Sequence, residues 1–248
     1  MFNARFLIAS GLVMIGTSAS ATVIAQDDFS YADGTLSGNG SAADAGWDGA
    51  WFDAQLFFGG TVVSNGTLSN VNSNVRTQRV LSTTTGADNT TLYVGFDYDP
   101  GTNFHGVEFY NGGNVSNDRT SFIGSIDPNP GTFSYNVGND GLTQSIGIAE
   151  PAGVNRYVIQ FNFGAADADT AEVFINGASV ASSTVASDLS FDRISLGTFS
   201  GGRLTTGGID FFDNLIIATT FEEANIPEPS SLALLGLGGI AMLRRRRI

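Results

Sequence analysis

The chain has no cysteine, no lysine and only one histidine among its 248 residues. The lack of cysteine excludes disulfides, thiolate metal sites and cysteine nucleophiles. Because His105 is the single histidine, a paired-histidine metal motif is impossible, and no Gly-x-Ser-x-Gly nucleophile elbow occurs either. We therefore expect His105 to be structural, expect no catalytic residue, and interpret the chain as a non-enzymatic protein.

Positive charge is scarce and is concentrated at the two ends of the chain. All 11 basic residues are arginines, and five of them, Arg5 and the four at positions 244–247, lie in the terminal segments. Residues 22–225 keep six arginines against 23 acidic residues, which is a formal charge of −17. Such a body repels nucleic acid and anionic membrane surfaces, so we expect no nucleic-acid partner. The charge would attract divalent cations, or it would serve solubility alone.

Residues 1–21 have the pattern of a secretory signal peptide. Arg5 supplies the positive start, an apolar stretch follows, and Ala19 and Ala21 place small side chains where a signal peptidase cleaves. We expect cleavage after Ala21, since the competing site after Ala25 would cut into the first predicted strand. A buried core helix is the alternative, but the charge, the length and the small-residue exit favour the signal peptide.

The C-terminus joins two prolines, an apolar run and a basic cluster. The prolines break any preceding strand and so separate this tail from the body. The apolar run at 232–243 is twelve residues long, whereas a membrane span needs about 20. The basic cluster would keep the C-terminal end of the apolar run on the cytoplasmic side of the membrane. Because the run is short, the tail is either a short transmembrane helix or an interfacial segment. The flanking residues are Pro227, Glu228, Pro229, Arg244, Arg245, Arg246 and Arg247.

This tail, residues 226–248, resembles the PEP-CTERM sorting signal of Gram-negative bacteria, also described as an ice-binding-protein C-terminal motif. In that family a Pro-Glu-Pro triplet, a short hydrophobic helix and a terminal basic cluster occur in this order. The resemblance implies handling by a membrane transpeptidase-like exosortase and an association with bacteria that make exopolysaccharide and biofilms. We therefore expect an exported protein that passes through the inner membrane to the cell envelope, the surface or the extracellular matrix.

Between the two ends, residues 22–225 alternate apolar and polar side chains in short runs bounded by glycine, asparagine and aspartate. In 156–163 the odd positions are apolar and most even positions are polar, which predicts one buried and one solvated face. No convincing amphipathic helix interrupts this pattern, so we predict one domain of two packed antiparallel sheets. The clearest predicted strands are 91–99, 105–111, 155–163, 171–176, 191–197 and 209–218.

The order of several segments resembles the concanavalin A-like, laminin-G-like bodies that often carry this tail. Segment 27–36 is similar to their first-strand motif and is followed by the tryptophan-containing 46–51. Segments 106–113 and 119–124 are similar to their central hairpin, and 209–215 to their last strand. The resemblance implies an all-β, antiparallel two-sheet sandwich of jelly-roll topology. The terminal segments add an expected apolar helix at each end.

Acidic residues near the strand ends suggest a structural calcium ion. The first and last strands of such sandwiches commonly lie side by side, which would bring Asp27 or Asp28 close to Asp213. Backbone carbonyls and aspartate carboxylates form the hard oxygen shell that Ca²⁺ prefers. No contiguous Asp-x-Asp-x-Asp-Gly loop occurs, so this site would be assembled from distant segments. The alternative is that these carboxylates are solvated strand ends.

Aromatic side chains offer stacking surfaces for sugar rings, and Trp47, Trp51 and Tyr110 are the candidate glycan-binding residues. The two tryptophans lie four positions apart in a glycine-rich segment, so they would equally well fill the edge of the core. The other surface on which a glycan could lie is the polar face of the predicted strands. It is formed by Asp97, Glu108, Tyr110, Gln160 and Asn162.

A carboxylate pair would allow glycoside hydrolysis, which needs two acids about 5 to 10 Å apart. Asp97 and Glu108 would meet in this way if their strands pair. However, the Glu-x-Asp-x-x-Glu signature of laminarinase-like sandwich hydrolases is missing. We therefore rank non-catalytic binding of a glycan or exopolysaccharide first. A purely structural matrix or envelope protein without a ligand comes second, and a glycoside hydrolase or lyase third.

Overall fold

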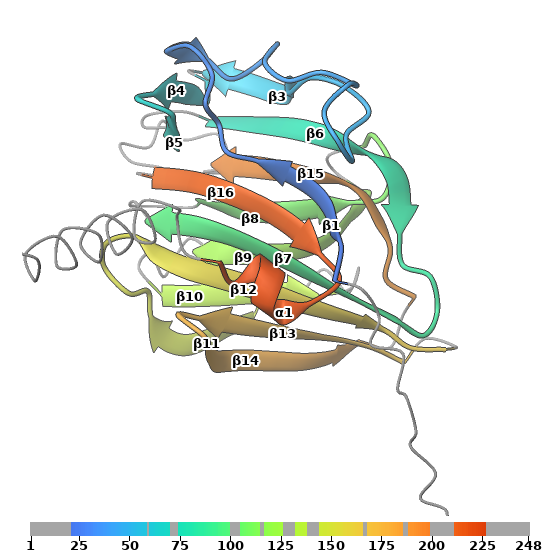
Figure 1. The fold of residues 1–248 in the computed structure, drawn as a ribbon. Coiled ribbons are helices and arrows are strands. Elements are labelled where there is room, and N and C mark those ends of the chain that lie inside the picture. Colours follow the sequence, from blue (N-terminus) through green and yellow to red (C-terminus); the bar gives the residue numbers. More distant parts are fainter. Residues whose placement is uncertain are drawn as a thin grey trace, which may run out of the picture.

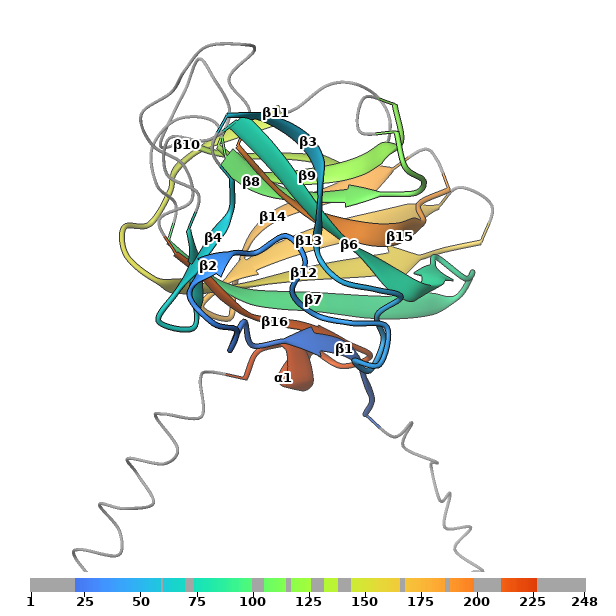
Figure 2. The ribbon, with the colours of Figure 1, turned by 90° about the horizontal axis from the view of Figure 1, so that it is seen from above.

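Two antiparallel β-sheets pack face to face in the computed structural model (Figure 1, Figure 2). One sheet contains β1 (Val23–Asp27), β2 (Gly34–Thr35), β4 (Val62–Ser64), β5 (Thr67–Ser69), β7 (Thr90–Asp99), β12 (Asn155–Phe163), β13 (Asp169–Ile175), β14 (Ala178–Val185) and β16 (Phe211–Ala218). The other contains β3 (Phe52–Phe58), β6 (Asn74–Thr85), β8 (His105–Tyr110), β9 (Arg119–Ser125), β10 (Thr132–Val137), β11 (Gln144–Ala149) and β15 (Phe191–Thr198). The structure describes residues 21–58, 60–69, 74–99, 105–114, 117–125, 132–137, 144–165, 168–185, 188–198 and 211–226.

The strand order confirms the predicted antiparallel sandwich. The first sheet, which has nine strands, runs β14-β13-β12-β7-β16-β5-β4-β2, and β1 also pairs with β16. The second, which has seven strands, runs β11-β10-β9-β8-β15-β6-β3. Strand β12 has the predicted bounds, and β8 and β9 form the predicted central hairpin. The first and last strands lie side by side as expected, with Asp27 opposite Leu215.

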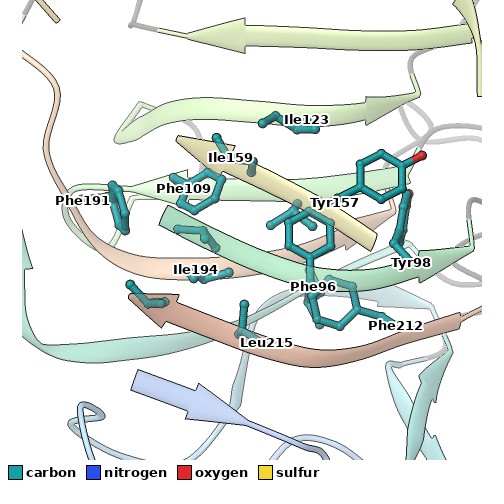
Figure 3. Close-up of a cluster of buried hydrophobic side chains, with 14 of the residues drawn as sticks. Phe96, Tyr98, Phe109, Ile123, Tyr157, Ile159, Phe191, Ile194, Phe212 and Leu215 are labelled. Atoms are coloured by element: carbon teal, nitrogen blue, oxygen red, sulfur yellow. The ribbon is translucent and has the colours of Figure 1, made fainter. Parts of the chain in front are cut away.

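The core lies between the two sheets and is rich in aromatic rings (Figure 3). Strand β12 turns Tyr157 and Phe161 inward, as the alternation predicted. Phe96 of β7 stacks on Tyr157 with ring centroids 5.8 Å apart. From the opposite sheet, Phe109 and Phe191 approach Phe161 to 5.1 and 5.3 Å. Such ring pairs join the sheets and add to the stabilisation from buried apolar area.

The short helix α1 (Phe221–Ala224) covers part of the outer face of the nine-stranded sheet (Figure 2). Thr220 caps it by accepting from the backbone N–H of Glu223. The Cβ of any side chain at Gly95 would lie 1.9 Å from the carbonyl oxygen of Ala224, so glycine permits this close packing. The helix buries Val158, which corrects the expectation that this face of the sheet is uniformly solvated.

The two predicted terminal helices lie outside the described residues. Within the described part of the chain, no helix is both long and apolar enough to cross a membrane. Of the two alanines at the expected cleavage site, Ala21 belongs to the described residues. It is exposed and precedes the start of β1 by two residues. Ala19 and the sorting-motif residues Pro227, Glu228, Pro229, Arg244, Arg245, Arg246 and Arg247 lie outside the described residues.

Candidate functional site

A pocket of about 910 Å³ opens on the outer face of the nine-stranded sheet. Three turns and three strand ends meet there, on the left of Figure 1, where β7 ends and β12 and β16 begin. The chain segment that follows α1 completes the wall. The pocket is lined by Asn65, Gly66, Thr67, Asp97, Val154, Asn155, Arg156, Asn176, Phe211, Asp213 and Asn225.

The floor of the pocket is built around a buried ion pair. The Nη1 group of Arg156 donates to Asp97 Oδ1 at 3.2 Å and to the carbonyl of Asn214 at 2.9 Å. Its Nε group donates to the carbonyl of Ala224 at 3.0 Å, so Arg156 also ties α1 to the sheet. Asp97 accepts a further hydrogen bond at Oδ2 from Asn214 Nδ2, at 2.8 Å. This bonding fixes the position of both charged groups.

A second carboxylate lies beside this pair, because Asp213 is the cross-strand neighbour of Asp97. Burial lowers the pKa of Arg156 below its ordinary value, although Asp97 and Asp213 oppose the effect. Among the residues that the structure describes, the floor therefore carries two acidic groups and one basic group. The negative excess disfavours a carboxylated or phosphorylated ligand in this pocket.

The rim is formed by two Asn-Gly hairpin turns. Asn65 and Asn176 have φ angles of 54° and 50°, and each is followed by a glycine that also has a positive φ. This is the backbone that two-residue hairpins require, and asparagine and glycine are the residues that adopt it most readily. The side chain of Asn176 accepts from the backbone N–H of Arg156 at 3.0 Å and donates to Asn155 Oδ1 at 2.8 Å. The turns thus hold rim amides in defined positions.

Apolar side chains complete the wall of the pocket. Val154 is 53% exposed, and Phe211 is half-buried. The pocket therefore combines amide and carboxylate acceptors with apolar surface. Such a combination suits a ligand that carries several hydroxyl groups on an apolar ring.

The structure does not bring the three predicted calcium ligands together. The Asp27 carboxylate is buried and accepts from Arg79 Nη1 at 2.5 Å, from Trp51 Nε1 at 2.8 Å and from the Tyr31 hydroxyl at 2.8 Å. Asp28 accepts from its neighbour Ser30, and Asp213 lies in the pocket. Among the described residues, no group of three or more histidine or acidic side chains is placed to hold a metal ion.

The three predicted sugar-stacking residues are buried, which corrects that prediction. Trp47, Trp51 and Tyr110 are at most 1% exposed, so none offers a ring to a ligand at the surface. The tryptophan rings pack against each other at 6.2 Å, and Trp47 donates to the carbonyl of Gln26 at 2.9 Å. They therefore fill the edge of the core, which was the alternative interpretation.

The carboxylates considered for hydrolysis lie on different sheets. Asp97 is in β7, which pairs with β12 and β16, whereas Glu108 is in β8, which pairs with β9 and β15. Their strands do not pair, so the two acids do not form the expected couple. The Glu108 carboxylate instead accepts from Arg76, Arg119 and Tyr110.

His105 lies between the sheets. Its Nδ1 atom shares a hydrogen bond with the Tyr98 hydroxyl, and its Nε2 atom lies 3.7 Å from Glu150 Oε2. Burial lowers the pKa of His105 to about 4. A neutral, buried imidazole bonded to a core tyrosine is consistent with a structural role.

The pocket residues that the sequence interpretation missed are Arg156, Asn155 and Asn176. Their roles depend on cross-strand neighbours that no local pattern reveals. The Asn-Gly dipeptides at 65–66 and 176–177 were the available signal, because each predicts a tight hairpin. They did not show that the two turns would face the same pocket.

Comparison with known proteins supports the predicted sorting motif of the tail and, separately, the β-sandwich fold of the body. Residues 225–247 match the family model described as the PEP-CTERM protein-sorting motif. No curated protein sequence is detectably similar to the chain. The chain is similar to the T. cruzi calreticulin globular domain at 10% identity and a TM-score of 0.50, over 71% of this chain and 86% of that one.

The chain is also similar to domain 4 of AbnA, a GH43 extracellular arabinanase from Geobacillus stearothermophilus, solved in complex with arabinotriose. Here the identity is 15% and the TM-score 0.50, over 84% of this chain and 98% of that one. Alginate lyase Aly36B reaches 16% identity over 80% of this chain and 96% of that one, but its TM-score of 0.44 supports no functional argument. These likenesses show the fold alone. The body is a β-sandwich similar in fold to the calreticulin globular domain and to domain 4 of AbnA, and its C-terminus carries a PEP-CTERM sorting motif.

Proposed function

We propose that this protein is a non-catalytic glycan-binding module that the C-terminal motif directs to the cell envelope or surface. The observation that carries the proposal is the open pocket of about 910 Å³, whose lining combines amides and carboxylates with apolar surface. We also propose that the body belongs to the concanavalin A-like sandwiches with jelly-roll topology, since its two-sheet architecture agrees with that class. The motif at 225–247 supports export and handling by exosortase.

The chemistry of the pocket favours a neutral sugar. Sugar hydroxyl groups donate to carboxylate and amide oxygens, which Asp213, Asn155 and Asn65 can supply. The C–H faces of a sugar ring can contact Val154 and Phe211. The negative excess on the floor repels acidic sugars, so a neutral glycan is the ligand class that fits best.

Removing one polar or one apolar contact should weaken glycan binding by about tenfold, a loss of about 1.4 kcal/mol. The test uses Asn155→Ala and Phe211→Ala in a glycan array and in titration calorimetry, with and without calcium. Ile148→Ala is the matched control, because Ile148 is 41% exposed on β11 and lies outside the pocket. Unchanged affinity in both pocket variants would place the glycan elsewhere. If no glycan binds, the purely structural matrix protein becomes the better interpretation.

The bonding of Asp97 argues against hydrolysis or lyase chemistry. Both of its oxygens already accept hydrogen bonds, from Arg156 and from Asn214. A glycosidase needs one carboxyl group that can protonate the leaving oxygen. We therefore expect no oligosaccharide product from any bound glycan. Product release that is lost in Asp97→Asn would show that the pocket is catalytic.

The sorting motif should act independently of the folded body. Truncation after Asn225 removes the matched tail but retains α1 and its contacts with the sheet. We expect the truncated protein to unfold at the same temperature as the mature protein, within about 2 °C. We also expect it to leave the envelope fraction and accumulate in the medium. Retention in the envelope without the tail would mean that the body itself provides the anchor.

A further inference from the structure

The pocket on the nine-stranded sheet is elongated, because its lining follows one row of residues across five neighbouring strands. Asp213 of β16 is the cross-strand neighbour of Asp97 on β7, and Asp97 is the neighbour of Arg156 on β12. Beyond Asp213 the row continues to Thr67 of β5, which pairs with β16. Beyond Arg156 it continues to Asn176, directly after β13, whose backbone N–H donates to the carbonyl of Arg156 at 2.8 Å. All five residues line the pocket.

The row is long enough for several sugar residues. The strand order β13-β12-β7-β16-β5 is continuous in the sheet (Figure 1). Adjacent strands lie about 4.8 Å apart, so the row extends about 19 Å, which is the length of roughly four rings in an extended chain. The pocket volume of about 910 Å³ lies near the upper end of the range of about 300–1,000 Å³ for small-molecule pockets. The rim asparagines at the two ends of the row, Asn65 and Asn176, are both exposed.

Helix α1 forms a wall along one long side of the row. The carbonyl of Ala224, at the end of this helix, accepts from Arg156 Nε at 3.0 Å. The same carbonyl lies against Gly95, which precedes Asp97 by two positions and therefore faces the same side of the sheet. A ligand in the pocket is confined on this side and has to lie along the row.

Apolar side chains form the opposite wall. Phe211 and Val154 precede Asp213 and Arg156 by two positions, and both line the pocket. Strands β16 and β12 run in the same direction, because each is antiparallel to β7, so the two apolar residues lie on the same side of the row. Two strand spacings, about 10 Å, separate them. Asp99 of β7, the cross-strand neighbour of Phe211, lies between them, and its carboxyl group again disfavours an acidic sugar.

We propose that the pocket binds an internal segment of an extended, β-1,4-linked chain of neutral hexoses that lies across the strands along this row. The assignment rests on the proposed glycan-binding function. In a β-1,4-linked chain each ring is turned over relative to the one before it, so rings two positions apart present the same face. Two such rings would contact Phe211 and Val154, while hydroxyl groups farther along the chain would meet Asn65 and Asn176. An α-1,4-linked chain curves, so fewer of its rings would follow the row.

Titration calorimetry of the mature protein with cello-oligosaccharides of increasing length tests the proposal. Affinity should rise by about tenfold or more from the disaccharide to the tetrasaccharide, because further contacts are made, and should change little from the tetrasaccharide to the hexasaccharide. Malto-oligosaccharides are the matched ligands, since they contain the same glucose units in α-1,4 linkage. Maltotetraose should bind about tenfold more weakly than cellotetraose.

Two pocket variants and a control would locate the chain. Val154→Ala removes one exposed apolar contact and should weaken cellotetraose binding by about fivefold. Asn65→Gly removes the side chain at one end but keeps a residue that readily adopts the positive φ of this turn. It should weaken tetrasaccharide binding and leave the disaccharide, held at Phe211 and Val154, unaffected. Asn89→Gly is the matched control, because Asn89 also has a positive φ, 61°, and lies outside the pocket.

Equal affinity for cellobiose and cellotetraose would overturn the proposal, because a short site would then suffice. Equal affinity for the two linkages would also overturn it, and so would unchanged tetrasaccharide binding in both Val154→Ala and Asn65→Gly. If the protein bound other neutral glycans on the array but no cello-oligosaccharide, the proposal would fail and the glycan-binding function would stand. Absence of binding to every glycan on the array would overturn both.

Discussion

Replacing Arg79 with methionine should lower the free energy of unfolding by about 3–5 kcal/mol. The Arg79 side chain is 1% exposed and that of Asp27 2% exposed, and they form an ion pair at 2.5 Å. Methionine would fill much of the same volume but would leave the Asp27 carboxylate buried without its counter-charge. An uncompensated buried charge is far more costly than the loss of a surface ion pair.

Arg79 also connects segments that are distant in the sequence. It forms an ion pair with Asp44, donates to the carbonyl of Gly49 at 3.0 Å and lies 4.6 Å from the ring centroid of Trp47. These contacts join strand β6 to the segment between β2 and β3, while Asp27 belongs to β1. The arginine therefore supplies the positive charge that the sequence interpretation assigned to calcium at Asp27.

Urea unfolding with two matched variants would test this prediction. Arg193→Met removes a partly exposed pair with the adjacent Asp192 and should cost less than about 1 kcal/mol. The double variant Asp27→Asn with Arg79→Met should be more stable than Arg79→Met alone, because it leaves no buried charge. A cost for Arg79→Met as small as that for Arg193→Met would contradict the buried pair.

Acidification from pH 6.5 to pH 4 should destabilise the wild-type protein by about 3 kcal/mol through His105 alone. Burial lowers the pKa of His105 from 6.5 to about 4 in the folded state. In this pH range the unfolded chain takes up a proton that the folded protein excludes, so stability falls as the pH falls. Well below pH 4 both states are protonated and this contribution stops changing.

The surroundings of His105 contain opposing influences. Glu150, with an oxygen 3.7 Å from Nε2, would favour the protonated ring, whereas the Tyr98 and Tyr157 side chains are neutral. Burial is the main factor that raises the pKa of the Tyr157 hydroxyl, and the negative charges of Glu150 and Asp99 raise it further. Because the imidazole is fully buried and its nearest carboxylate lies beyond hydrogen-bond distance, desolvation should dominate over the attraction to Glu150.

Urea titrations of the wild type and His105→Gln at pH 4, 5, 6 and 7 would measure this contribution. Glutamine can still bond to the Tyr98 hydroxyl but does not titrate. The difference in unfolding free energy between the two proteins isolates His105 from the carboxylates, which titrate in both. We expect the wild type to lose stability relative to the variant as the pH falls. The opposite trend would show that the ion pair with Glu150 outweighs burial.

The alternation of side chains along the chain was enough to predict the strands and the sandwich. In β12 every second residue is apolar, and this period of two defines an inward face without reference to any partner strand. The sorting motif of the tail could also be predicted from the sequence, because it consists of a few residues in a fixed order within one short segment. Both features are local, so the sequence by itself determined them.

The sites depended on which strands became neighbours, and only the tertiary structure decided that. Asp97 and Glu108 lie on strands that follow each other in the sequence, yet these strands entered different sheets. Trp51 carries a polar group suited to a sugar, but its Nε1 group is used inside the protein by Asp27. The pocket joins turns, strands and a helix end whose positions range from Asn65 to Asn225. Contacts at such separations are set by sheet order and register, which a period of two does not encode.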